Sequence, residues 1–116
     1  MKQIALLLLL TLAGFITKAQ TAKELIGKWK LVKQTQNGVV KEPKDTYQVF
    51  EDNGVFKGIN GDKSRKGSWN LSDDNEYLTI KISIISLKFK VEHFDAKRRV
   101  ISNEKTGTLE YEKVEG

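Results

Sequence analysis

The sequence predicts an all-β fold, an eight-stranded antiparallel up-and-down barrel that a signal peptide precedes. Apolar residues recur with a period of two from residue 24 onward, as expected of half-buried strands. Short turns rich in Asn, Asp and Gly separate these strands, and no segment between them reads as a crossover helix. With 116 residues, the chain has room for one domain. We therefore expect a signal peptide over 1–19 and a β-barrel domain over 20–116.

Residues 1–19 have the three parts of a secretory signal peptide. A basic start at Lys2 precedes an apolar stretch over 4–16, and Thr17 and Ala19 are small residues at the −3 and −1 positions of a cut after Ala19. This stretch of about thirteen residues is too short to span a bilayer as a helix, which takes ~20. The chain has no cysteine that could carry a lipid at the cut. We expect an exported protein, periplasmic or secreted, with no transmembrane anchor after cleavage.

The first strand is expected over 25–32, where apolar residues form one face and mostly lysines form the other. One helical turn over 21–24 is expected before it, because its Thr and Glu have the spacing of a capping box. Residues 34–45, which include Asn37-Gly38, are expected to form a polar loop.

A hairpin is expected to join strands over 46–51 and 55–60. Its loop, Asp52-Asn53-Gly54, places a glycine where a left-handed conformation is required, and this register brings Phe50 opposite Phe56.

The next strands are expected over 65–71 and 76–83. Pairing Leu71 with Leu78 and Trp69 with Ile80 would put all four side chains on the same face. The last three strands are expected over 87–94, 99–103 and 108–114. The side chains expected to face the interior are Trp29, Leu31, Phe50, Phe56, Trp69, Leu71, Leu78, Ile80, Ile82, Leu87, Phe89, Val91, Leu109 and Tyr111.

One short motif occurs twice. Gly27-Lys28-Trp29-Lys30-Leu31 is followed forty residues later by Gly67-Ser68-Trp69-Asn70-Leu71. In each copy the glycine and the tryptophan share the inner face of a strand, so we expect the small residue to make room beside the large one.

The segment 24–32, which contains the first of these motifs, resembles the opening of the bacterial lipocalin-like domain family, a group of small exported calycin-type barrels. The similarity continues through 47–56, 67–74 and 78–80, and covers the chain from about residue 23 to 114. The resemblance implies an eight-stranded antiparallel barrel and supports ligand binding inside it. It implies no catalytic residues.

Residues suited to catalysis or metal binding are few. His93 is the only histidine and the chain has no cysteine, which excludes a His–His metal site and a thiol nucleophile. The paired carboxylates Glu51-Asp52 and Asp73-Asp74 are expected at turn tips, where such residues are usually solvated, whereas an acid/base pair needs a shielded cleft. We expect a protein that is not an enzyme and has no metal and no cofactor.

Two basic clusters, Lys63–Lys66 and Lys97–Arg99, contribute to a formal net charge of +5. Nucleic-acid platforms interleave aromatic and basic residues on one exposed surface, whereas the aromatic residues here are expected to face inward. We therefore expect both clusters to form solvated surface that limits aggregation, and we expect no nucleic-acid partner.

Two functions remain open for a monomeric barrel of this size. The first is binding of a small apolar ligand through the barrel mouth, with contacts from His93, Phe89, Tyr111, Trp29 and Trp69. His93 is expected to face inward at a strand end, either as a polar handle for the ligand or, the alternative we favour, as a hydrogen-bonded residue of the barrel rim. The second is a protein–protein interaction module, such as an inhibitor or an envelope-complex subunit, with a filled barrel. An eight-stranded barrel suits either, and the many bulky inward residues favour filling.

We predict that the mature chain begins at Gln20 and lies outside the cytoplasm, because the segment before it has the form of a cleavable signal. Sequencing the N-terminus of the processed protein checks this. An uncut Met1 in the membrane fraction would contradict it.

Overall fold

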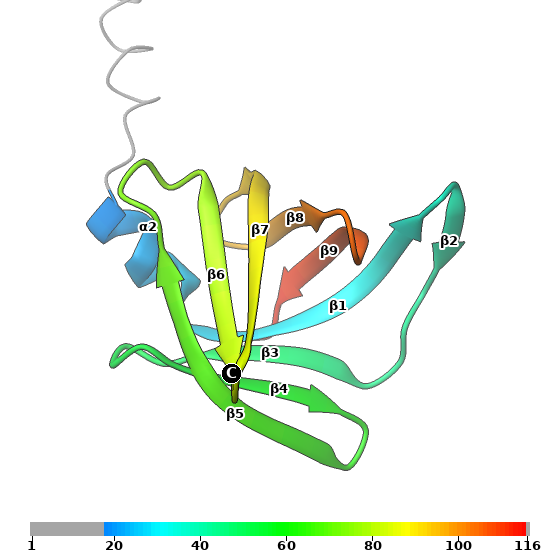
Figure 1. Ribbon diagram of the computed structural model, residues 1–116, viewed down its shortest axis with the longest axis horizontal. Helices are drawn as coiled ribbons and strands as arrows, with labels where there is room; N and C mark the ends of the chain where they lie inside the picture. The colour runs from blue at the N-terminus through cyan, green and yellow to red at the C-terminus, as the bar shows by residue number, and fades with distance from the viewer. Residues whose placement is uncertain (1–17, 116) are drawn as a thin grey trace, which may run out of the picture.

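Eight antiparallel strands close into a barrel in the computed structural model, which describes residues 18–115 (Figure 1). From β3 onward each strand pairs with the next, and β1 pairs with both β3 and β9, so the sheet closes on itself. A further short strand, β2, pairs with β1 at the edge of the sheet. The elements are α2 (Lys18–Leu25), β1 (Gly27–Gln36), β2 (Val39–Lys41), β3 (Thr46–Phe50), β4 (Val55–Asn60), β5 (Lys63–Leu71), β6 (Tyr77–Ile82), β7 (Ile85–Phe94), β8 (Arg98–Asn103) and β9 (Gly107–Lys113).

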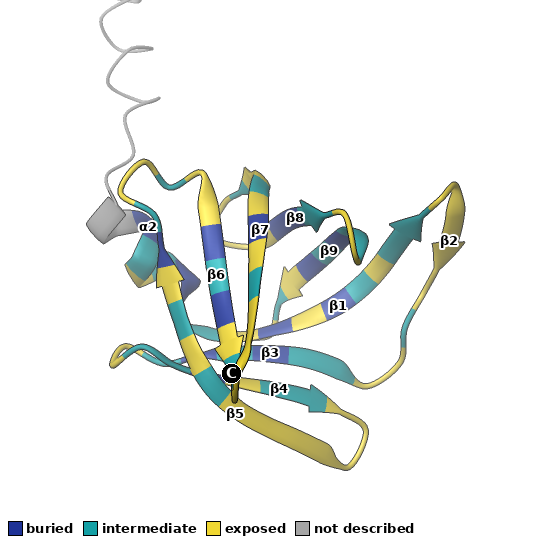
Figure 2. Cartoon of the chain, viewed as in Figure 1, coloured by how far each residue is buried: buried dark blue, intermediate teal, exposed yellow. Residues whose placement is uncertain are grey.

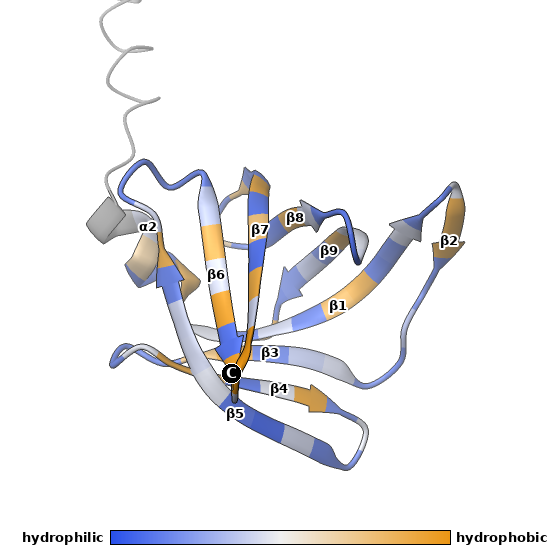
Figure 3. Cartoon of the chain, viewed as in Figure 1, coloured by the Kyte–Doolittle hydropathy of each residue, from blue (hydrophilic) through white to orange (hydrophobic). Residues whose placement is uncertain are grey.

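The predicted barrel and its central registers are confirmed. Phe50 pairs with Phe56 across the β3–β4 hairpin, and their rings lie edge to face with centroids 5.3 Å apart. Leu71 pairs with Leu78, as predicted for β5 and β6. Along β6 and β7 apolar and polar residues alternate (Figure 3), so one face of each strand is apolar. Period-two patterning and turn residues were sufficient to predict these pairings.

The segment 34–45 differs from the polar loop expected there. β1 continues to Gln36, and the chain then turns back through Asn37-Gly38 into β2. Asn37 and Gly38 both have positive φ, at 53° and 78°, which suits a two-residue hairpin turn. The Asn-Gly pair was therefore a hairpin signal inside a segment whose polar side chains suggested a loop.

A β-bulge in β7 reverses the alternation expected there. Val91 pairs with Ile101 and His93 pairs with Val100, so Glu92 is an extra residue in β7. Beyond the bulge Phe94 turns toward the core and packs against Trp29, with ring centroids 6.0 Å apart. The prediction that His93 faces the interior is wrong, because the bulge places its side chain outside, 44% exposed.

The core fills the end of the barrel that α2 covers (Figure 2). All fourteen apolar and aromatic residues predicted to face inward lie in this core or pack against it, and Leu25 and Ile101 add to it. In place of the single helical turn expected over 21–24, α2 extends over eight residues. Trp29 is 0% exposed, and its indole Nε1 donates a hydrogen bond to the carbonyl of Leu25, 2.8 Å away. The buried indole therefore holds the end of α2 against the barrel.

Gly67 was expected to make room beside Trp69, but the structure gives it a different role. A Cβ at this position would overlap the backbone carbonyl oxygen of Lys81, and it would come within 3.0 Å of the Ile82 side chain. The glycine thus allows β5 and β6 to approach closely where β5 bends, a common role of glycine in barrels. Trp69 lies apart from this contact, and its Nε1 donates to the carbonyl of Glu51 at 2.9 Å.

We predict that Trp29→Ala lowers the free energy of unfolding by about 3–5 kcal/mol, the usual range for emptying a buried aromatic site. Lys30→Ala, at the next and exposed position of the same strand, should change it by less than about 0.5 kcal/mol. Urea unfolding of the two variants checks this. A cost below ~1 kcal/mol for Trp29→Ala would contradict the central place of this residue.

Candidate functional site

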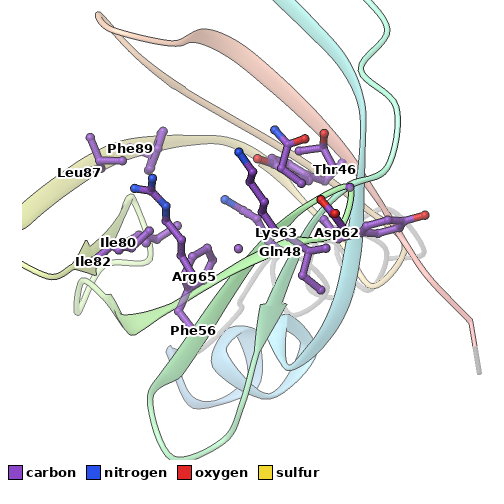
Figure 4. A pocket seen from close by; sticks show the side chains of 16 residues that line it. Thr46, Gln48, Phe56, Asp62, Lys63, Arg65, Ile80, Ile82, Leu87 and Phe89 are labelled. Atoms are coloured by element: carbon purple, nitrogen blue, oxygen red, sulfur yellow. The ribbon is translucent and has the colours of Figure 1, made fainter.

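The end of the barrel away from α2 opens into a cavity of about 710 Å³ (Figure 4). Its wall is apolar on the side of β6 and β7, where Ile80, Ile82, Leu87 and Phe89 line it. Cavities of roughly 300–1,000 Å³ with a mostly apolar wall are typical of small-molecule sites. The barrel is therefore filled in one half and open in the other, whereas the bulky inward residues had favoured filling throughout.

The residue types on β4 and β5 explain why this half is open. Toward α2 the inward positions carry large apolar side chains such as Phe56 and Leu71. Toward the mouth the same faces carry Gly58 and Asn60 on β4, with Arg65 opposite Gly58 and Lys63 opposite Asn60. Glycine occupies little space and the polar residues reach toward solvent, so nothing bulky and apolar fills the barrel there.

The four residues of the cluster over 63–66 are exposed, as expected, but Lys63 and Arg65 have a further position at the mouth of the cavity. Both line the cavity, and Figure 4 shows their side chains extending into it from β5. The intervening Ser64 and the following Lys66 are exposed and lie outside the lining. The sequence held the signal, because both cations share the period-two parity of Trp69, which was correctly predicted to face inward.

Arg99 departs from the surface role expected of its cluster. It is 1% exposed, and its guanidinium lies over the rings of Trp29, Phe50 and Tyr111, at 4.7, 4.9 and 4.6 Å from their centroids. Its Nη2 donates to Oε1 of Gln48 at 2.6 Å, while its Nε and Nη1 have no hydrogen-bonding partner among the described residues. Ring faces and one amide thus replace the carboxylate that a buried guanidinium usually has.

Gln48 and Tyr111 connect this buried cation to the cavity. Both touch Arg99 and both also line the open space, where they are the polar groups on the side nearest Arg99. Burial lowers the pKa of Arg99 to about 10 and raises the pKa of Tyr111 to about 12. At neutral pH the guanidinium is therefore charged and the phenol protonated. The side-chain oxygen of Gln48 accepts the hydrogen bond from Arg99, so the side-chain NH₂ group of Gln48 is the donor that remains for the cavity.

The structure brings together two of the five residues predicted for the ligand site. Phe89 and Tyr111 line the cavity, whereas Trp29 and Trp69 lie outside the lining. His93 also lies outside it, and its Nε2 is 2.8 Å from a carboxylate oxygen of Asp95. Sequence reasoning missed Gln48, Lys63 and Arg65 as cavity residues.

Asp95 organises the turn beside His93. The backbone N–H of Lys97, the His93 side chain and the backbone N–H of Arg98 all donate to its carboxylate, and these contacts lower the pKa of Asp95 to about 2. His93, near the end of β7, is thus bound to the solvated turn between β7 and β8 and lies away from the cavity.

Among residues 18–115, no group of three or more His, Cys, Asp or Glu side chains is placed to hold a metal ion. Within that same part of the chain, no helix is long and apolar enough to cross a membrane.

Comparisons with known proteins agree with this architecture. The family described as C-terminal lipocalin-like domain matches residues 11–112. A crystal structure of a lipocalin-like protein from Bacteroides uniformis ATCC 8492 superposes with a TM-score of 0.68 at 20% identity, covering 78% of this chain and 99% of that one. A crystal structure of an uncharacterized protein from Bacteroides eggerthii DSM 20697 gives a TM-score of 0.64 at 19% identity, with the same coverage. No curated protein matches the chain significantly.

We predict that Gln48 and Arg99 are energetically coupled. Gln48→Leu should lower the free energy of unfolding by about 1–3 kcal/mol, because it leaves a buried charged donor without its acceptor. In an Arg99→Met background the same substitution should cost much less, since no charge remains to be satisfied. Urea unfolding of the two single variants and the double variant measures the coupling. An equal cost of Gln48→Leu in both backgrounds would show that the bond contributes nothing.

Proposed function

The chain belongs to the family of C-terminal lipocalin-like domains, and from this premise we propose that it is a binding protein that holds one small, largely apolar molecule in the open half of its barrel. The observation that carries the proposal is the cavity of about 710 Å³. Its size is that of a small-molecule site, and apolar side chains from three strands contribute to its wall.

The position of the cavity also supports binding. The core that stabilises the barrel lies toward α2, so the open half can remain empty or occupied without changing the contacts of Trp29. Apolar groups on the wall would release water when a ligand covers them, at roughly 25 cal/mol per Å² of buried surface. Gln48 and Tyr111 would orient the ligand, because a few polar groups on an apolar wall typically fix orientation.

The proposal is one of binding without a reaction. It includes export of the mature chain, which the signal-like segment over 1–19 supports; residues 1–17 of that segment lie outside the described residues.

One surface feature favours a second function, that of a protein-interaction module. β2 is an edge strand, and its Val39 and Val40 are each 56% exposed. An apolar edge strand is suited to pairing with an additional strand from a protein partner. This function does not require an occupied cavity, so a lack of saturable probe binding in the next experiment would favour it.

We predict that the protein binds N-phenylnaphthylamine, an uncharged fluorescent probe of apolar sites, saturably and with one site per chain. Leu87→Ala should weaken this binding about five- to tenfold, since it removes apolar wall contact worth roughly 1–1.5 kcal/mol. Leu87 suits this test better than Phe89, which is also part of the buried core. Fluorescence titration of both proteins measures the effect.

Ser86→Ala is the matched control, because Ser86 is the neighbouring position on the outer face of β7, opposite Lys81. It should leave the affinity unchanged. If Ser86→Ala and Leu87→Ala weaken probe binding equally, the probe binds outside the cavity.

A further inference from the structure

The mouth of the cavity carries two cations that form no ion pair with another described residue. Lys63 and Arg65 both line the cavity, and within the described chain neither side chain has an ion-pair or hydrogen-bonding partner. Elsewhere on the barrel several exposed cations are paired, for example Lys57 with Glu51 at 3.3 Å and Arg98 with Glu110 at 3.0 Å. The cations that face the cavity therefore remain available to a ligand.

Their positions suit one shared anionic group. Residues two apart on a strand point to the same side and lie about 7 Å apart along it, so two long side chains can converge on one group between them. The lining includes one carboxylate, that of Asp62, so its formal charge is two positive minus one negative, or +1.

The deep side of the cavity does not offer a comparable site for an anion. Arg99 is covered by aromatic rings and does not line the open space. The groups that line the cavity there, the Gln48 amide and the Tyr111 phenol, are neutral at pH 7. Burying an anion against neutral groups costs more free energy than leaving it at a hydrated mouth beside two cations.

We propose that the ligand is an anionic amphiphile, whose headgroup lies between Lys63 and Arg65 while its apolar tail extends along Ile80, Leu87 and Phe89. The inference rests on the proposed binding function and adds the chemical class of the ligand. A single carboxylate, sulfonate or phosphate group could pair with the two cations at the mouth, and an unbranched or ring-containing hydrocarbon could contact the apolar wall.

The test compares decanoate with decanol, which share a tail and differ in headgroup charge, as competitors of N-phenylnaphthylamine. Decanoate should displace the uncharged probe at a concentration roughly tenfold lower than decanol, and raising NaCl from about 50 mM to about 500 mM should narrow this difference. In the Lys63→Gln/Arg65→Gln double variant the two competitors should become equal, with decanol unchanged. Lys66→Gln is the matched control, because Lys66 lies on the same strand outside the lining, and it should retain the difference.

The outcomes separate this inference from the function on which it rests. If the probe does not bind, the proposed function fails and the inference fails with it. If the probe binds and decanoate is no better than decanol, or neither displaces it, the binding function stands and the anionic headgroup is overturned. If Lys66→Gln reduces the preference for decanoate as much as the double variant does, the inference is also overturned. The preference would then arise from the overall positive charge of the surface and not from Lys63 and Arg65.

A second variant tests the orientation of the ligand. Gln48→Glu keeps an acceptor for Arg99 and places a negative charge on the deep side of the cavity. It should leave the preference for decanoate nearly unchanged if the headgroup lies at the mouth. A preference that Gln48→Glu abolishes and the Lys63→Gln/Arg65→Gln variant retains would place the headgroup beside Gln48 and overturn the proposal.

Discussion

The closed half of the barrel depends on the guanidinium of Arg99. This side chain comes from β8, and the three rings around it come from β1, β3 and β9, so one cation connects four strands. No carboxylate neutralises it among the described residues; Gln48 and the faces of Trp29, Phe50 and Tyr111 take that place. A planar and weakly hydrated guanidinium is suited to such a site, whereas the compact and strongly hydrated ammonium of lysine is not.

A second cation, Lys113, also packs against Trp29 and bonds to the chain at the end of α2. The ammonium of Lys113 lies 4.6 Å from the Trp29 ring centroid and donates to the carbonyls of Glu24 and Ile26, at 2.8 and 2.6 Å. Partial burial and the nearby charge of Arg99 lower the pKa of Lys113. The last strand is thereby joined to the carbonyls at the end of α2, which need donors from outside the helix. Stability is concentrated at one end, and the other end is left open for a cavity.

The sequence was sufficient to predict the barrel because strand faces and turns depend on local patterns. The pairing of Phe50 with Phe56 followed from alternation and one glycine turn. The inward position of His93 was predicted wrongly, because a one-residue bulge reverses a strand face without any sign in the pattern. Arg99 was missed as an interior residue because a charged side chain was taken to face solvent. Lys63 and Arg65 are exposed, as expected, but were missed as residues of the cavity mouth. Of the cavity residues, Phe89 and Tyr111 were predicted correctly because they are aromatic.

Closure of the barrel between its first and last strands also determines when the chain can fold. Leu31 on β1 pairs with Tyr111 on β9, a contact between residues far apart in the sequence, and such contacts slow folding because a long loop must close first. During synthesis, Trp29 leaves the ribosome long before Phe94, Arg99 and Lys113, which lie against its ring. Until β9 is complete, the nascent chain presents an uncovered indole, a surface that chaperones bind and that aggregation exploits. The barrel therefore cannot close until β9 has left the ribosome.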